Sequence, residues 1–316
     1  MLRPFQPLST TSFFNYQRTI QNQLKNTRNK SWTKGLRLGT VFVIILFALA
    51  GYYYYVQDSV RVETVDFSSS LLGKRMPYGV VLPRGYGLIT KRGVRYPVLY
   101  LLHGWSGNYD SWLKETALVQ YASEHKLIIV TPEGHNGWYT DSATVPSDQN
   151  ETYITQELIP DVDSRFRTVP HRSGRAVAGC SMGGYGALKF GLKHPEMFSL
   201  VASMSGALDA TSRTDDTSIM QTFGELNSPT RLANDLQRLV RDFPAERQAS
   251  LPYFYLDCGT EDPWLEVNRE FASTLSERKI SHDYRQLSGG HVWPYWDRQV
   301  DEVLQVAEDR MVSASH

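Results

Sequence analysis

A series of short, uninterrupted apolar runs restricts the fold of this chain more than any other feature. The runs are Pro97–Leu102, Leu127–Thr131, Ala176–Gly179, Leu200–Met204 and Tyr253–Asp257. A strand without polar alternation is buried on both faces, as in a parallel sheet. Helical patterns fall between the runs, near residues 111–124, 151–166, 184–193 and 264–278. Strands that alternate with helices in this way predict an α/β domain.

Three further strands and one insertion complete the pattern. Val60–Phe67 and Met76–Leu82 read as strands separated by a Ser/Gly turn, and His282–Leu287 reads as a short strand near the end. We therefore expect one domain over about residues 60–310, with a mostly parallel central sheet flanked by helices. Leu208–Ser250 is a longer, more polar insertion. The sequence leaves open whether it covers a site or forms surface helices.

One N-terminal segment is apolar enough to cross a membrane. Leu36–Val56 carries a single charge, Arg37, and ends in the four tyrosines Tyr52–Tyr55, which are typical of an aromatic belt at a membrane interface. About 18 apolar residues suffice to span a bilayer. We expect a basic N-terminal segment over 1–35, a transmembrane anchor or signal sequence over 36–56, and the α/β domain over 57–316.

The charges before this segment predict its orientation. Seven Lys/Arg residues and no acid occur in residues 1–40, which favours an N-terminus on the cytoplasmic side and an extracytoplasmic α/β domain. Three alternatives remain open. Ala48-Leu49-Ala50 resembles a signal-peptide cleavage site, which would make the protein secreted. The acid-free start resembles a mitochondrial presequence, and a buried core helix is the third possibility. An uncleaved anchor is the preferred interpretation.

The charge balance of the chain after residue 40 argues against nucleic-acid binding. The sequence has 33 Lys+Arg and 33 Asp+Glu, so removal of the seven basic residues leaves 26 basic against 33 acidic residues, a net charge of −7. A nucleic-acid partner is therefore not expected. The two cysteines, Cys180 and Cys258, are too few for a disulfide scaffold or a cysteine-built metal site. We expect them to be unpaired, because the Leu200–Met204 strand would separate their strands.

Ser181 is the candidate nucleophile. It is the centre of the G-x-S-x-G pattern Gly179-Cys180-Ser181-Met182-Gly183, which runs from an apolar strand into a Gly-rich helix start. Small residues on both sides of the serine allow the tight strand-to-helix turn that exposes its hydroxyl. The alternative is an ordinary Gly-rich turn. An oxyanion hole would take one backbone N–H from Met182 and a second from Trp105, in the loop His103-Gly104-Trp105 after the Pro97–Leu102 strand. His103 itself is expected to be structural.

A histidine and an acid follow in the order expected for the α/β-hydrolase fold. His291 lies on the Gly-rich loop after the last strand, and Asp262 lies on the loop after the Tyr253 strand. Asp262 before Pro263 could instead be an ordinary helix N-cap, with the proline as the first helical residue. Glu261 is the second choice for the acid, and Asp257 is expected at the strand end.

Six segments together resemble the putative esterase family, also called the esterase D family, of α/β-hydrolases. They are LLHGWSG at 101–107, TPEGHNGWYTDS at 131–142, ETYITQELIPDVDSRF at 151–166, GCSMGGYGALKFGLKHP at 179–195, CGTEDPWLEVNREF at 258–271 and GGHVWPYW at 289–296. The resemblance implies a triad of Ser181, Asp262 and His291, an oxyanion hole from the backbone of Trp105 and Met182, and no metal or organic cofactor. It covers about residues 62–308.

The family includes carboxylesterases, S-formylglutathione hydrolases, feruloyl and acetyl-xylan esterases, and mycolyltransferases. The loop at 136–142 is most similar to that of the short-chain carboxylesterases, and Trp138 and Tyr139 would either line the acyl pocket or pack in the core. We therefore expect a membrane-anchored serine carboxylesterase that cleaves a small-molecule or lipid ester. The alternatives are an acyltransferase with the same triad, an S-formylglutathione-type thioesterase and a non-enzymatic tether. The sequence leaves open whether the protein has protein partners.

Overall fold

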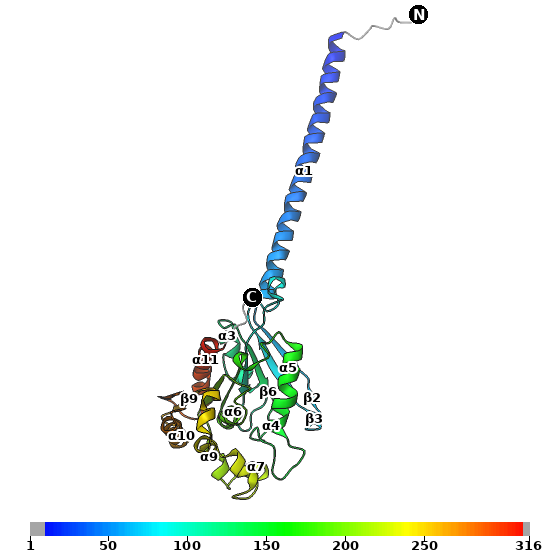
Figure 1. Cartoon of the computed structure of the whole chain (residues 1–316). Helices are drawn as coiled ribbons and strands as arrows, with labels where there is room; N and C mark the ends of the chain where they lie inside the picture. Colours follow the sequence, from blue (N-terminus) through cyan, green and yellow to red (C-terminus); the bar gives the residue numbers. More distant parts are fainter. Residues whose placement is uncertain (1–9, 312–316) are drawn as a thin grey trace, which may run out of the picture. The chain divides into compact units, whose positions relative to one another are not determined.

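The computed structural model describes residues 10–311, apart from the side chains of residues 10–14, 16 and 29–39. These residues divide into two compact units that meet at Val56 and Gln57. The N-terminal unit is formed by helix α1 (Thr10–Asp58), drawn in blue in Figure 1. Part of the predicted basic segment over 1–35 lies outside the described residues, since residues 1–9 are not among them.

The apolar part of α1 agrees in place with the predicted membrane segment. Thr40–Asp58, 19 residues, is long and apolar enough to cross a membrane by length and composition, and its side chains are largely exposed. At 1.5 Å per residue it spans about 28 Å, close to the thickness of a bilayer's hydrocarbon core. The helix differs from the expectation in its start, because it begins at Thr10 and continues through the predicted boundary at residue 36.

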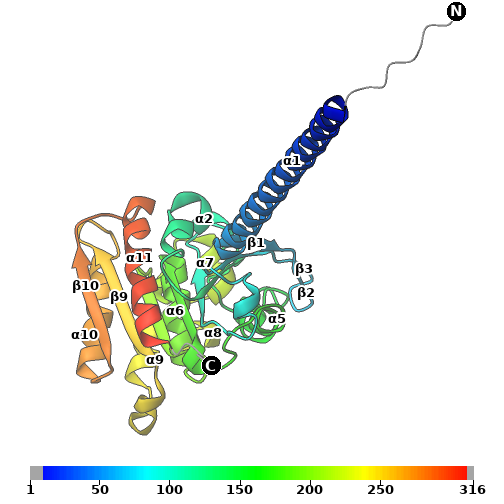
Figure 2. The ribbon, with the colours of Figure 1, turned by 90° about the horizontal axis from the view of Figure 1, so that it is seen from above.

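The second unit is built on an eight-stranded sheet. Its strands, in spatial order, are β1 (Arg61–Val65), β4 (Tyr78–Leu82), β6 (Ile128–Pro132), β5 (Val98–Leu102), β7 (Arg175–Cys180), β8 (Leu200–Met204), β9 (Tyr253–Gly259) and β10 (His282–Leu287). The first two pairs, β1 with β4 and β4 with β6, are antiparallel, and all the other pairs are parallel. In Figure 2 the neighbours β9 and β10 close one edge of the sheet. A separate ribbon pairs β2 (Ser68–Ser69) with β3 (Lys74–Arg75).

Helices cover both faces of this sheet, which explains the uninterrupted apolar runs. In β5, Val98, Tyr100 and Leu102 face one core cluster, whereas Leu99 and Leu101 face the other. Successive side chains of a strand point to opposite faces, so a strand with both faces buried needs an apolar residue at every position. The first face carries α4 (Asn150–Tyr153), α5 (Ile159–Arg165), α6 (Met182–Lys193) and α10 (Leu265–Glu277). The second carries α2 (Ser111–Glu115), α3 (Leu118–Tyr121) and α11 (Trp293–Arg310).

Two of the predicted helices are interrupted. The pattern at 111–124 forms α2 and α3 because Thr116 takes an extended conformation between them. The pattern at 151–166 contains a π-helical turn at Ile154–Leu158, just before Pro160, whose missing N–H cannot take part in a regular helical ladder. The insertion at 208–250 folds into α7 (Thr217–Phe223), α8 (Pro229–Asn234) and α9 (Leu236–Arg241), together with short 3₁₀ turns at Ala210–Ser212 and Ala245–Ser250.

The topology gathers several loops at the carboxyl edge of the sheet. Parallel strands end at the same edge, so the loops after β5, β7, β9 and β10 approach one another there. Cys180 and Cys258 are both buried and unpaired, on strands that β8 separates, as expected. The predicted residues Trp105, Ser181, Asp262 and His291 all lie in these four loops.

Candidate active site

Ser181 occupies a strained turn between β7 and α6. Its backbone has φ 55° and ψ −118°, a region that residues other than glycine rarely adopt. The turn is held in place because the Ser181 N–H donates to the carbonyl of Met204 on β8, at 3.0 Å. Strain of this kind is stored where the surrounding structure over-determines the backbone. The conformation lifts the serine hydroxyl away from the sheet edge.

The two glycines of the G-x-S-x-G pattern allow the close packing behind this turn. A Cβ on Gly179 would lie 2.5 Å from the carbonyl carbon of Gly183, and a Cβ on Gly183 would lie 2.5 Å from the carbonyl oxygen of Leu102. Both contacts involve backbone atoms, which cannot move aside as a side chain can. The helix, the turn and the neighbouring strand are therefore too close together for any side chain at these positions.

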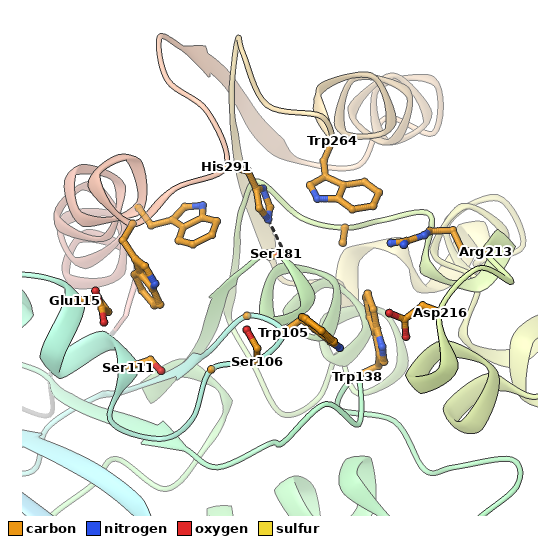
Figure 3. Close-up of a pocket in the computed structure, with 15 residues that line it drawn as sticks. Trp105, Ser106, Ser111, Glu115, Trp138, Ser181, Arg213, Asp216, Trp264 and His291 are labelled. Carbon is orange, nitrogen blue, oxygen red and sulfur yellow. Dashed lines mark hydrogen bonds between the residues drawn. The ribbon is translucent and has the colours of Figure 1, made fainter.

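Ser181, His291 and Asp262 form one chain of hydrogen bonds. Nε2 of His291 lies 2.9 Å from Oγ of Ser181, and Nδ1 lies 2.9 Å from Oδ2 of Asp262. Figure 3 shows the dashed bond from His291 to Ser181 across the cavity. Since a carboxylate only accepts hydrogen bonds, Nδ1 carries the proton and Nε2 is free to accept from the serine hydroxyl. In this arrangement His291 can accept the proton of Ser181, and the carboxylate of Asp262 can stabilise the resulting imidazolium.

The surroundings of Asp262 keep its carboxylate ionised. Burial alone would raise its pKa, but the hydrogen bonds from His291 and from the backbone N–H of Trp264 outweigh burial and leave the pKa below its usual range. The bond from Trp264 N to Oδ1 measures 2.8 Å. Helix α10 begins only at Leu265, with Trp264 at its N-cap, so the alternative that Asp262 caps this helix with Pro263 as its first residue is wrong.

The two competing acids bond elsewhere. Glu261 accepts from the hydroxyl of Thr260 and from the backbone N–H of Gly289, so it holds the loop that carries the histidine. Asp257 is fully buried within β9, which continues to Gly259 beyond the expected strand end, and its Oδ1 accepts from the Tyr295 hydroxyl at 2.9 Å. Burial raises the pKa of Asp257 to about 8. Of the three acids, the structure thus brings Asp262 to the histidine.

The loop after β5 passes next to Ser181. A Cβ on Gly104 would lie 3.4 Å from Cβ of Ser181, so the loop backbone is close to the serine. Buried His103 supports the loop: its Nδ1 lies 2.8 Å from the carbonyl oxygen of Gly104, and its Nε2 accepts from the Gly134 N–H at 3.0 Å. Met182 is the first residue of α6, and the first N–H groups of a helix have no partner within the helix.

A cavity of about 450 Å³ opens above Ser181 and His291. Its wall includes five of the seven tryptophans in the sequence together with a few charged and polar side chains. The lining residues are Gly104, Trp105, Ser106, Gly107, Ser111, Glu115, Trp138, Ser181, Ala207, Arg213, Asp216, Trp264, His291, Trp293 and Trp296. Cavities of this size, lined by aromatic side chains and a few polar groups, are typical of small-molecule sites. Within residues 10–311, no cluster of three or more His, Cys, Asp or Glu side chains could hold a metal ion.

Comparison with known proteins places the chain in a family. Residues 68–305 match the family model described as Putative esterase. The chain belongs to this esterase family. An acetyl esterase of Caldicellulosiruptor saccharolyticus is 30% identical over 218 residues, which cover 66% of this chain and 81% of that protein.

Two further comparisons extend over more of the chain. An esterase of Mycobacterium tuberculosis is 31% identical over 287 residues, 81% of this chain and 62% of that relative, so the alignment spans less than two thirds of the relative's length. Among solved structures, a ferulic acid esterase superposes with a TM-score of 0.71 at 28% identity and covers 80% of this chain and 100% of that one. The α/β-hydrolase fold expected from the sequence is therefore correct.

Trp138 and Tyr139, the two adjacent aromatic residues of the loop at 136–142, have different surroundings in the structure. Trp138 lines the cavity, with its backbone at φ 51°. Tyr139 is completely buried, and its hydroxyl donates to the carbonyl of His103 at 3.0 Å. Of the two roles that the sequence left open for Tyr139, its burial and this hydrogen bond agree with packing, whereas Trp138 lies in the cavity wall.

Several residues of this esterase's cavity were not predicted. Arg213 and Asp216 come from the 208–250 insertion, whose contribution to the site the sequence left open. Trp264 and Trp296 flank His291, with ring centroids 6.3 Å and 4.8 Å from the imidazole and interplanar angles of 65° and 88°. Both tryptophans lie within segments that carried the family resemblance. Trp264 comes two residues after Asp262 and Trp296 five residues after His291, and this closeness to predicted site residues was the available signal. No comparable signal marks Arg213.

Proposed function

We propose that this protein is a serine carboxylesterase in which Ser181, His291 and Asp262 form the catalytic triad. The observation that carries the proposal is the unbroken hydrogen-bond chain of 2.9 Å and 2.9 Å through both ring nitrogens of His291. Its serine end stands on the strained turn at φ 55°, open to the cavity. Membership of the esterase family supports the same chemistry.

The mechanism follows from these contacts. His291 takes the proton of Ser181 as the hydroxyl oxygen attacks the ester carbonyl, and the negative charge of Asp262 stabilises the imidazolium. The backbone N–H groups of Trp105 and Met182 would stabilise the oxyanion. The imidazolium then protonates the departing alcohol, which leaves an acyl group on Ser181. In the second half, His291 activates water, which releases the acid.

We further propose that the substrate is an ester of a short acyl chain. The cavity of about 450 Å³ is bounded by tryptophan rings, so it suits an apolar group of limited size next to the carbonyl. The relative named acetyl esterase supports a small acyl group. Arg213, Asp216 and Glu115 add charge to the wall and give the cavity polar partners for the rest of the substrate.

Attachment to a membrane through α1 is the remaining part of the proposal. Thr40–Asp58 is apolar and exposed, and the basic residues that precede it favour a cytoplasmic N-terminus. An uncleaved anchor predicts that the full chain stays in the membrane pellet after alkaline carbonate washing. Recovery of a shortened chain in the soluble fraction would instead support a removed signal peptide.

Hydrolysis of p-nitrophenyl butyrate by the full chain in detergent tests the proposed reaction. The wild-type chain is expected to release p-nitrophenol, and Ser181→Ala is expected to lose about 10⁶ in turnover while it keeps its fold. Activity that survives in Ser181→Ala would overturn the triad assignment. Product formation that requires an added alcohol would favour acyl transfer over hydrolysis.

A further inference from the structure

We propose that Ser218, in the 208–250 insertion, is a positioning residue that determines substrate specificity by holding the indoles of Trp105 and Trp138 in the cavity wall. The inference rests on the proposed function of this cavity as the ester site. Nε1 of Trp105 lies 3.3 Å from Oγ of Ser218, and Nε1 of Trp138 lies 3.2 Å from the same atom. Figure 3 shows the two indoles next to each other, with their nitrogen atoms on the side of Asp216.

The hydrogen-bonding capacity of Ser218 is fully used in this arrangement. A hydroxyl has one proton to donate and two lone pairs to accept with, whereas an indole nitrogen only donates. Oγ of Ser218 therefore accepts from both tryptophans, and its own proton goes to Oδ1 of Asp216 at 2.5 Å. The three bonds are mutually consistent, and each fixes the direction of the others.

Asp216 anchors Ser218 at the start of α7. Its Oδ1 also accepts from the backbone N–H of Ser218 at 2.7 Å and of Ile219 at 3.1 Å. Burial alone would raise the pKa of Asp216, but the hydrogen bonds from the Ser218 hydroxyl and from the two amides leave the pKa below its usual range. The carboxylate thus stays an acceptor, which orients the Ser218 lone pairs toward the indoles.

The two indoles depend on this hydroxyl to different degrees. Trp138 is 3% exposed, and its ring packs against Tyr185 and Phe223 with centroid distances of 5.7 Å and 6.2 Å. Trp105 is 51% exposed, and within the described residues its indole N–H donates its hydrogen bond to Ser218. Loss of the hydroxyl would therefore release mainly Trp105 and leave the buried N–H of Trp138 unpaired.

The backbone of the loop that carries Trp105 is held separately. The carbonyl of Gly104 lies 2.8 Å from Nδ1 of His103 and accepts from Gly107 N at 3.1 Å. Ser106 N donates to Oδ1 of Asn136 at 2.8 Å. Removing the Ser218 hydroxyl should therefore disturb the indoles and leave the backbone N–H groups near Ser181 in place. The effect should fall on substrate binding in the cavity rather than on attack at the carbonyl.

Thr144, which bonds to the same helix from the 136–149 segment, offers a matched control. Thr144 Oγ1 donates to the carbonyl of Gln221 at 2.8 Å, so it also anchors α7 to the 136–149 segment. Thr144 is exposed and does not line the cavity. Thr144→Val removes one hydrogen bond to α7 without touching either tryptophan. Ser218→Thr keeps the hydroxyl and serves as the conservative variant.

The test compares two esters on the full-length wild type, Ser218→Ala, Ser218→Thr and Thr144→Val. For p-nitrophenyl benzoate, Ser218→Ala is expected to lower kcat/KM about tenfold, mainly through KM, because disordered walls must be ordered again on binding. For p-nitrophenyl acetate, which barely contacts the walls, the change should stay within about twofold. Tryptophan emission should shift in Ser218→Ala, and Ser218→Thr and Thr144→Val should behave as wild type.

Other results would contradict either the role of Ser218 or the proposed esterase function. Equal losses for both esters, no loss for either, or the same selectivity change in Thr144→Val would overturn the role of Ser218 while leaving the proposed esterase activity intact. A wild-type chain that hydrolyses neither ester would overturn the proposed function, and the specificity role with it. These two failures are distinguished by the wild-type measurement alone.

Discussion

The carboxylate of Asp262 meets Nδ1 of His291 at 2.9 Å, although 28 residues separate the two positions in sequence. The side chain of Asp262 is completely buried, whereas that of His291 keeps 24% of its surface exposed. The acid therefore faces the histidine from the protein side, and the histidine faces the cavity. A triad requires this order, because the buried carboxylate orients the imidazole ring and leaves Nε2 facing Ser181 and the cavity.

Replacing this acid should abolish most of the activity. Asp262→Asn keeps the shape but would donate its amide to the ring, which favours the wrong tautomer at Nε2, and we expect a loss of about 10⁴ in kcat. Glu261→Gln is the matched control, because Glu261 bonds Thr260 and Gly289. Its kcat should stay within about tenfold of wild type. A larger loss in Glu261→Gln than in Asp262→Asn would reverse the assignment of the acid.

Asp257 should make folding stability depend on pH. Its pKa is about 8 in the folded protein, raised by burial, against a model-compound value of 3.8. Between about pH 4 and pH 8 the unfolded chain is therefore ionised while the folded chain stays protonated, so the free energy of unfolding falls as pH rises. The expected slope is roughly 1 kcal/mol per pH unit.

Asp257→Asn tests this linkage, because asparagine is neutral at every pH and its Oδ1 can still accept from Tyr295. Urea unfolding of both proteins at about pH 5 and about pH 8 provides the measurement. We expect the variant to gain stability relative to wild type as the pH rises. The same pH dependence in both proteins would show that Asp257 does not titrate in this window.

Gly183 should tolerate no side chain. In Gly183→Ala the new Cβ would lie 2.5 Å from the carbonyl oxygen of Leu102 and 2.8 Å from that of His103. Overpacking against backbone should cost about 3 kcal/mol and displace the Ser181 turn, so both stability and activity should fall. Gly93→Ala is the control, since no atom lies within 4 Å of its Cβ position. A Gly183→Ala variant with wild-type thermal stability would contradict the packing described for the turn.

Lys189 should stabilise the loop that carries Trp138. This fully buried lysine of α6 donates to Thr140 Oγ1 at 2.9 Å, to Glu151 at 2.8 Å and to the carbonyl of Tyr139. We expect Lys189→Met to lower the free energy of unfolding by about 2 to 3 kcal/mol. This is less than is usual for a broken buried pair, because Lys193 still forms an ion pair with Glu151 and His194 still hydrogen-bonds to it.

Arg238 provides the exposed counterpart. It pairs with Asp242 one helical turn away at 3.2 Å, and Arg238→Met should cost less than about 0.5 kcal/mol. Chemical unfolding of the two variants side by side gives the comparison. An equal decrease in the free energy of unfolding in Lys189→Met and Arg238→Met would show that the buried Lys189 contacts stabilise the fold no more than an exposed ion pair does.

The sheet could be predicted from the sequence because its central strands have both faces buried. Leu200–Met204 was placed with its observed bounds, and the runs at 97–102 and 127–131 differ from β5 and β6 by one residue at each displaced end. The site residues around Ser181 carried an equally local signal, since the contacts at Gly179 and Gly183 exclude every other residue type.

The rest of the site depends on tertiary contacts that leave no local pattern. Ser218 belongs to a polar insertion, and its bonds to Trp105 and Trp138 span 113 and 80 residues of sequence. The extended Thr116 that divides α2 from α3 lies within a continuous helical pattern, and its hydroxyl accepts from the N–H of Leu118. The direction of Tyr139 likewise follows from the position of the His103 carbonyl, which the sequence does not reveal.

Covalent labelling of Ser181 tests the central claim most directly. The full chain is treated with a fluorophosphonate, digested and mapped by mass spectrometry, with wild type and Asp262→Asn compared under the same conditions. The triad predicts one stoichiometric adduct on the peptide that contains Ser181 and much slower labelling in the variant. An unlabelled Ser181 in a folded wild-type chain, or equal labelling rates in both proteins, would contradict it.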